Sequence, residues 1–138
     1  MTEKDNLQMH EAEEEVVQKQ RELKITRIVA NYLRRLGIPS NLRGYYYVRD
    51  AITLNLFNPN KQYMITKELY PEVAKRHKST GARVERSIRK ALEVAWERGD
   101  EEFIQEIFGN TISSRRRKPT NSEFISQVAE DIRMKNLI

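Results

Sequence analysis

The stretch between residues 79 and 96, STGARVERSIRKALEVAW, constrains the fold more than any other part of the chain. Three of its cations, Arg83, Arg86 and Lys90, fall within about 60° of one another on a helical wheel, and we call them the cationic ridge. The apolar residues gather on the other side, in a stripe about 100° wide that comprises Val84, Ile88, Ala91, Leu92 and Ala95. A helix needs only its apolar stripe to fold against a core, so the cationic ridge requires a separate explanation.

A short polar turn, Ser79-Thr80-Gly81, separates this helix from a preceding one that we expect to end near His77. A helix, a turn of three or four residues and a longer helix form the layout of the helix-turn-helix motif. The second helix of that motif enters the major groove of DNA, and its first residues reach the base edges. Here those residues include Arg83, Glu85 and Arg86. Arginine bonds guanine O6 and N7 in a bidentate manner, and glutamate accepts from cytosine N4, so this combination favours G·C pairs.

Two other interpretations of the cationic ridge stay open at this point. It is also compatible with the solvated face of a basic protein, or with an anionic partner other than DNA.

Helical periodicity recurs elsewhere, and no alternating strand pattern interrupts it. We therefore predict an all-α fold of about six helices around the helix-turn-helix, with no sheet. A bend is expected at Pro71, Asp100 is a good N-cap, and TNSE at 120–123 has the spacing of a capping box. The expected helices cover about 25–36, 45–57, 66–77 in two pieces, 81–98, 101–108 and a last segment from about 121.

The 138 residues are enough for one domain and short for two. The net charge of +5 is unevenly distributed. Residues 1–24 carry seven acids and four bases, and we predict an acidic linker or partly helical arm there. Residues 25–138 carry 21 bases and 13 acids, and we predict that they form a domain with an anionic partner.

Several classes of function are disfavoured by what the sequence lacks. It has no cysteine and only two histidines, which argues against a metal site, and we expect no cofactor. The acidic cluster around Glu97 and Asp100 is explained by helix capping, and no nucleophile–base pair accompanies it, so we predict that the protein is not an enzyme. Neither a membrane span nor a signal peptide is recognisable, and we expect a cytoplasmic, nucleoid-associated bacterial protein without membrane contact.

Three segments together resemble the C-terminal effector domain family of stage zero sporulation protein A, a response-regulator transcription factor. They are GIPSNLRGYYYVRDAI, YPEVAKRHKSTGARVERSIRKALEVAWERGD and IFGNTISSRRRKPTNSEFISQVAEDIR. The resemblance covers about residues 25–135. It implies a six-helix domain that binds a TGTCGAA-like promoter box, activates or represses transcription through a sigma subunit of RNA polymerase, and occupies adjacent boxes in tandem copies.

The resemblance also implies roles for individual residues. It implies that Arg83, Glu85 and Arg86 read bases. It also implies that Gln105 and Phe108 contact sigma. Phe108 is equally compatible with a position in the core. For the basic loop before the last helix, a phosphate grip and mere solubility both stay open. The expected contacts to the DNA backbone are Thr80, Arg89, Lys90, Arg115, Arg116, Arg117 and Lys118.

The chain departs from the family pattern in two places. Ala82 stands where a small hydroxyl residue is usual, and nothing in the sequence resembles the phosphorylatable receiver domain. A second class of function also stays open, namely a module that binds a sigma factor or RNA polymerase without reading DNA sequence.

Overall fold

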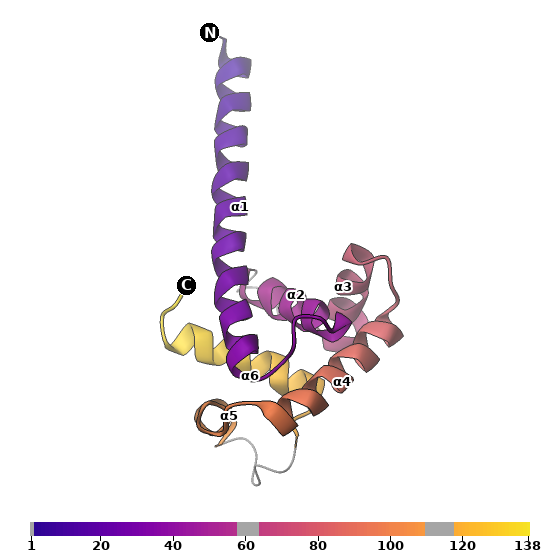
Figure 1. Ribbon diagram of the computed structural model, residues 1–138. Coiled ribbons are helices and arrows are strands. Elements are labelled where there is room, and N and C mark those ends of the chain that lie inside the picture. The colour runs from indigo at the N-terminus through magenta and orange to yellow at the C-terminus, as the bar shows by residue number, and fades with distance from the viewer. Residues whose placement is uncertain (1, 58–63, 110–117) are drawn as a thin grey trace.

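The computed structural model describes residues 2–57, 64–109 and 118–138, and the regular structure within them is helical throughout (Figure 1). The all-α fold expected from the sequence is confirmed. The elements are α1 (Glu3–Arg35), α2 (Arg43–Phe57), a π-helical turn η1 (Ile65–Leu69), α3 (Tyr70–Arg76), α4 (Gly81–Arg98), α5 (Glu101–Phe108) and α6 (Asn121–Met134).

Helix α1 begins 22 residues earlier than its apolar periodicity predicts, at Glu3 instead of Ile25. A capping box explains the early start: the Thr2 hydroxyl accepts from the Asp5 N–H at 3.2 Å, and the Asp5 carboxylate accepts from the Thr2 N–H at 3.2 Å. No glycine or proline occurs before Gly37, and good helix formers dominate the segment. All side chains from Glu3 to Arg21 are exposed, and the first buried one is that of Ile25. The 33-residue helix is about 50 Å long and extends well beyond the rest of the molecule (Figure 1).

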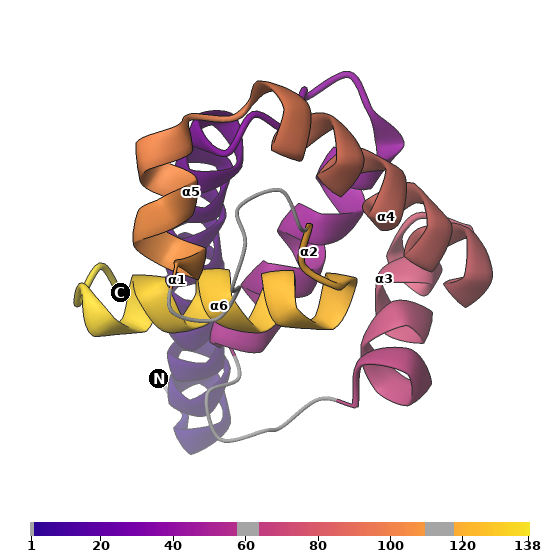
Figure 2. The same ribbon diagram turned by 90° about the horizontal axis from the view of Figure 1, so that it is seen from below.

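Helix α2 lies at the centre of the domain, where α1, α3, α4 and α6 all pack against it (Figure 2). Nine of its fifteen residues are buried, which explains why its sequence lacks a clean amphipathic pattern. Gly44 allows α2 and α4 to approach closely. A Cβ added there would collide with the carbonyl oxygen of Ser87 and lie 2.8 Å from Cβ of Ala91.

At the bend expected near Pro71, the chain changes from a π-helical turn, η1, to the α-helix α3. The turn η1 is π-helical, and its last N–H bond, from Tyr70 to the Ile65 carbonyl, precedes Pro71 at the start of α3. Proline has no N–H, and its ring would clash with the carbonyl four residues earlier in a regular helix, so the wider turn relieves both problems.

The short helix α5 and the last helix α6 close one side of the core. Asp100 caps α5 by accepting from the N–H groups of Glu102 and Phe103, and Thr120 and Glu123 form the expected capping box of α6. The ring of Phe108 stacks on Phe124 with centroids 5.5 Å apart. Among the described residues, no helix is both long and apolar enough to cross a bilayer.

Candidate nucleic-acid interface

The helix-turn-helix consists of α3, a four-residue turn and α4. Lys78 adopts a left-handed conformation with φ 52°, and the Ser79 N–H donates to the Ala74 carbonyl at 2.8 Å, which ends α3 and reverses the chain. Thr80 then caps α4, because its hydroxyl accepts from the Arg83 N–H at 3.2 Å. The first turn of α4 is thereby fixed next to the residues expected to read bases.

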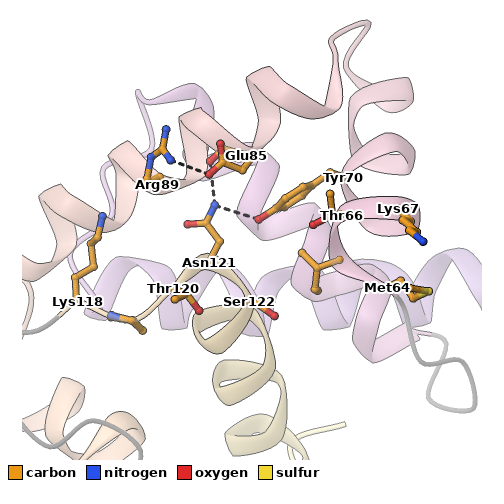
Figure 3. A pocket seen from close by; sticks show the side chains of 12 residues that line it. Met64, Thr66, Lys67, Tyr70, Glu85, Arg89, Lys118, Thr120, Asn121 and Ser122 are labelled. Atoms are coloured by element: carbon orange, nitrogen blue, oxygen red, sulfur yellow. Dashed lines mark hydrogen bonds and ion pairs between the residues drawn. The ribbon is translucent and has the colours of Figure 1, made fainter.

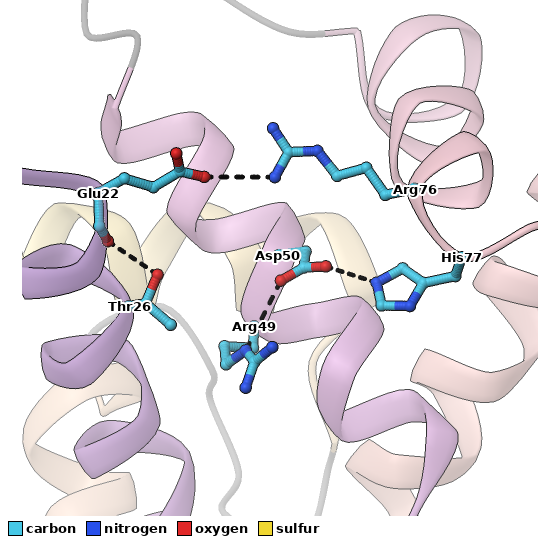
Figure 4. A network of polar contacts seen from close by, with 6 residues as sticks. All are labelled: Glu22, Thr26, Arg49, Asp50, Arg76 and His77. Atoms are coloured by element: carbon cyan, nitrogen blue, oxygen red, sulfur yellow. Dashed lines mark hydrogen bonds and ion pairs between the residues drawn. The ribbon is translucent and has the colours of Figure 1, made fainter. Parts of the chain in front are cut away.

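A side-chain contact holds this turn against α2. Nε2 of His77 lies 2.5 Å from Oδ2 of Asp50, and the His77 ring packs edge-on against Tyr47 with centroids 5.1 Å apart (Figure 4). The same region contains an ion pair between α3 and α1, in which Arg76 Nη1 is 3.4 Å from Glu22 Oε1. His77, for which the sequence indicated no catalytic or metal role, therefore positions the start of α4.

Helix α4 separates apolar and basic residues as its sequence predicts. Its buried residues are Val84, Ile88, Ala91, Leu92 and Ala95. All three residues of the cationic ridge, Arg83, Arg86 and Lys90, are exposed. Within residues 2–57, 64–109 and 118–138, no ion pair involves any of them. Uncompensated positive charge on an exposed helix attracts a polyanion.

The other two described cations of the expected interface, Arg89 and Lys118, are paired. Nη1 of Arg89 is 3.1 Å from Oε1 of Glu85, one helical turn away, and Nζ of Lys118 is 3.4 Å from Oε1 of Glu93. Arg89, Lys118 and Glu85 line an open pocket between η1, α4 and the start of α6 (Figure 3). The surface therefore divides into a cationic ridge without ion-pair partners among the described residues and a neighbouring side on which the cations are paired with glutamates.

Asn121, the first residue of α6, connects the elements around this pocket. The sequence analysis predicted no role for it. Its Nδ2 donates to the Glu85 carbonyl at 2.9 Å and to the Tyr70 hydroxyl at 3.1 Å (Figure 3). The side chain is buried, so it fixes α4 against α3 and α6. Its position inside the TNSE capping box was visible in the sequence, but its partners lie 36 and 51 residues away.

The remaining expected site residues have different environments. Arg115, Arg116 and Arg117 lie outside the described residues. Gln105 is exposed on α5, whereas Phe108 is 1% exposed and stacked in the core. Phe108 was expected either at the sigma-contacting surface or in the core. It lies in the core, and its ring is not available at the surface.

Comparison with known protein families gives a match over this region. The family model described as "Sporulation initiation factor Spo0A C terminal" matches residues 29–132. The match includes all of the helix-turn-helix and α5, and it leaves out the part of α1 before residue 29.

Proposed function

The chain belongs to the Spo0A C-terminal family of DNA-binding sporulation effector domains, and from that premise we propose that it regulates transcription by reading a promoter box with α4. The proposed target is a TGTCGAA-like sequence, with the start of α4 in the major groove. The observation that carries this proposal is the exposure of Arg83 and Arg86, without ion-pair partners among the described residues, at the capped end of α4.

Each base-reading residue has a distinct role in this proposal. Arg83 and Arg86 donate in bidentate fashion to guanine O6 and N7. Glu85 accepts from cytosine N4, and to do so its carboxylate must share or exchange its contact with Arg89. The intrahelical pair thus keeps Glu85 oriented along α4 in the absence of DNA.

The proposed contacts to phosphate surround these residues and supply affinity without sequence preference. Lys90 extends the cationic ridge, and the Thr80 hydroxyl keeps a proton to donate while it caps α4. Arg89 and Lys118 join them by exchanging glutamate partners for phosphate oxygens. The loop residues Arg115, Arg116 and Arg117 are proposed phosphate contacts on sequence grounds.

A comparison of two duplexes at one physiological salt concentration tests this function. We expect the protein to bind the TGTCGAA-like box at least about a thousandfold more tightly than a scrambled duplex of the same composition. Equal affinity for the two duplexes would refute sequence reading and leave only charge-driven association.

We also infer that α5 contacts a sigma subunit of RNA polymerase, with Gln105 at the contact. Support comes from the exposure of Gln105 on a helix whose other side is anchored in the core by Phe108. In a pull-down with purified sigma subunit, Gln105→Ala should weaken capture, whereas the exposed α1 variant Gln18→Ala should not. If both variants are captured like the parent chain, α5 is not the contact.

A module that binds sigma or polymerase without reading DNA is the second candidate. The paired charges of Glu85–Arg89 and Lys118–Glu93 favour it to a limited degree, because they lower the net positive charge beside the ridge. Retained capture of sigma together with equal binding of box and scrambled DNA would support this candidate over the first.

For the extent of the DNA-binding unit, we propose residues 25–138, with residues 1–24 as an arm. The proposal rests on burial, which begins at Ile25 and is absent from Glu3 to Arg21.

A further inference from the structure

Helix α1 carries an exposed apolar stripe between residues 9 and 23. Met9, Val16 and Leu23 are 51%, 54% and 57% exposed and follow one another at intervals of seven residues. Seven residues fall only about 20° short of two full helical turns, so the three side chains line one side of the helix. We call these three residues the arm stripe.

The arm stripe lies on the outer side of α1, opposite the residues that α1 buries. Its last member, Leu23, borders a groove shared with Arg49 and Asp50 of α2. Its direction differs by about 150° from that of Ile25, Val29 and Leu33, which α1 buries in the core. Further along the same outer side, Arg27 and Arg34 are exposed. The N-terminal part of α1 extends clear of α2–α6 (Figure 1), so a second helix can lie along it there without meeting them.

Charge along α1 is divided between its two ends. Residues 11–15 contain four glutamates and no base. Residues 19–27 contain four bases, Lys19, Arg21, Lys24 and Arg27, and one acid, Glu22, which is paired with Arg76 on α3. In the described part of the chain no ion pair involves any of these four bases. A parallel, in-register pair of such helices would oppose acid to acid, whereas an antiparallel pair opposes acid to base.

We propose that two copies of this chain associate through the arm stripes of their α1 helices, packed antiparallel with Val16 near the two-fold axis. The contact is isologous, since the same surface serves both copies. Met9 and Leu23 are each seven residues from Val16, so Met9 of one copy lies beside Leu23 of the other. Residues 11–15 of each copy, with four glutamates, then lie level with residues 17–21 of the other, which contain Lys19 and Arg21. Asp5 lies level with Arg27. This association does not rest on DNA binding and goes beyond the function proposed above.

Single cysteines test both the contact and its direction, because the chain contains no cysteine of its own. In the full-length chain under mild oxidation, Val16→Cys should form a disulfide-linked dimer. A mixture of Met9→Cys and Leu23→Cys chains should form the mixed dimer, whereas Met9→Cys alone should not link to itself. Leu7→Cys, at an equally exposed position on the opposite side of α1, is the matched control. Linkage of Met9→Cys to itself would contradict the antiparallel direction, and linkage no faster than that of Leu7→Cys at every stripe position would refute the contact.

Sedimentation equilibrium of the cysteine-free chain provides a second measurement. We expect a concentration-dependent dimer in low salt, with the dissociation constant raised at least about tenfold by Val16→Lys and left nearly unchanged by Leu7→Lys. A monomer at all concentrations, or equal effects of the two lysine variants, would overturn the proposal.

Discussion

Arg89 and Glu85 form an ion pair on the exposed side of α4, with 3.1 Å between Nη1 and Oε1. Sequence reasoning assigned the two residues separate tasks, phosphate binding for Arg89 and base reading for Glu85. Their contact makes these tasks interdependent, because moving either side chain to DNA releases the other.

A double-mutant cycle in DNA binding measures this interdependence. Glu85→Ala should relax the preference at one G·C position, and Arg89→Ala should lower affinity for all duplexes. The combined variant should differ from the sum of the two effects by about 0.5 kcal/mol or more, because each single change alters the partner's freedom to reach DNA. Strict additivity in fluorescence anisotropy titrations would show that the pair has no influence on binding.

Close packing of α2 on α4 predicts that Gly44→Ala is destabilising. The added methyl group would meet the Ser87 carbonyl and Ala91, which are parts of a packed helix and cannot swing aside. We expect a loss of about 1–3 kcal/mol in the free energy of unfolding, measured by urea denaturation. Gly81→Ala is the matched control, since the nearest atom, Cβ of Tyr70, would be 3.7 Å from the new methyl group. Equal stability of the two variants would contradict this account of the interface.

Removing the Asn121 side chain should loosen the start of α4. Asn121→Ala leaves the Glu85 carbonyl and the Tyr70 hydroxyl without the donor they now share, and we expect a loss of about 1–3 kcal/mol in unfolding free energy. Discrimination between specific and scrambled duplexes should also fall, because the base-reading residues are less well fixed. The exposed neighbour Ser122 is the control, and Ser122→Ala should change stability by less than about 0.5 kcal/mol. Discrimination unaffected by Asn121→Ala would limit this residue to a role in stability.

A fourth prediction concerns alkaline pH and the contact between α1 and α6. Burial, together with a 2.7 Å hydrogen bond donated to Asp131, raises the pKa of Tyr32 to about 12. Tyrosine in an unfolded chain titrates near pKa 10, so the folded state holds the proton more tightly. The stabilising contribution is complete below pH 10 and is lost as the pH rises from about 10 to about 12. The difference in unfolding free energy between the parent chain and Tyr32→Phe should therefore shrink across this window, and a constant difference would contradict the assignment.

Those parts of the fold that depend on neighbours in sequence were predictable. The bounds of α4, the Asp100 cap and the Thr120–Glu123 capping box all follow from local spacing. For residues 1–24 the sequence left a linker and a partly helical arm both open. Periodicity reports burial, and a helix held by its Thr2 cap and by propensity alone has no such signal. The Glu85–Arg89 contact has the usual four-residue spacing of helical ion pairs and was open to prediction. The link from Asn121 to Tyr70 was not, since only tertiary packing brings the two together.

The most direct test of the central claim measures how tightly Arg86→Ala and Lys90→Ala bind two duplexes. One duplex carries the box, and the other carries the box with altered G·C pairs. Both residues are exposed on the cationic ridge and carry the same charge. At fixed salt, Arg86→Ala should lose about 1–3 kcal/mol of discrimination between the duplexes. Lys90→Ala should weaken both duplexes alike and reduce the slope of log K against log salt by about 0.9. If Arg86→Ala also weakens both duplexes equally, α4 does not read sequence, and the proposed function is wrong.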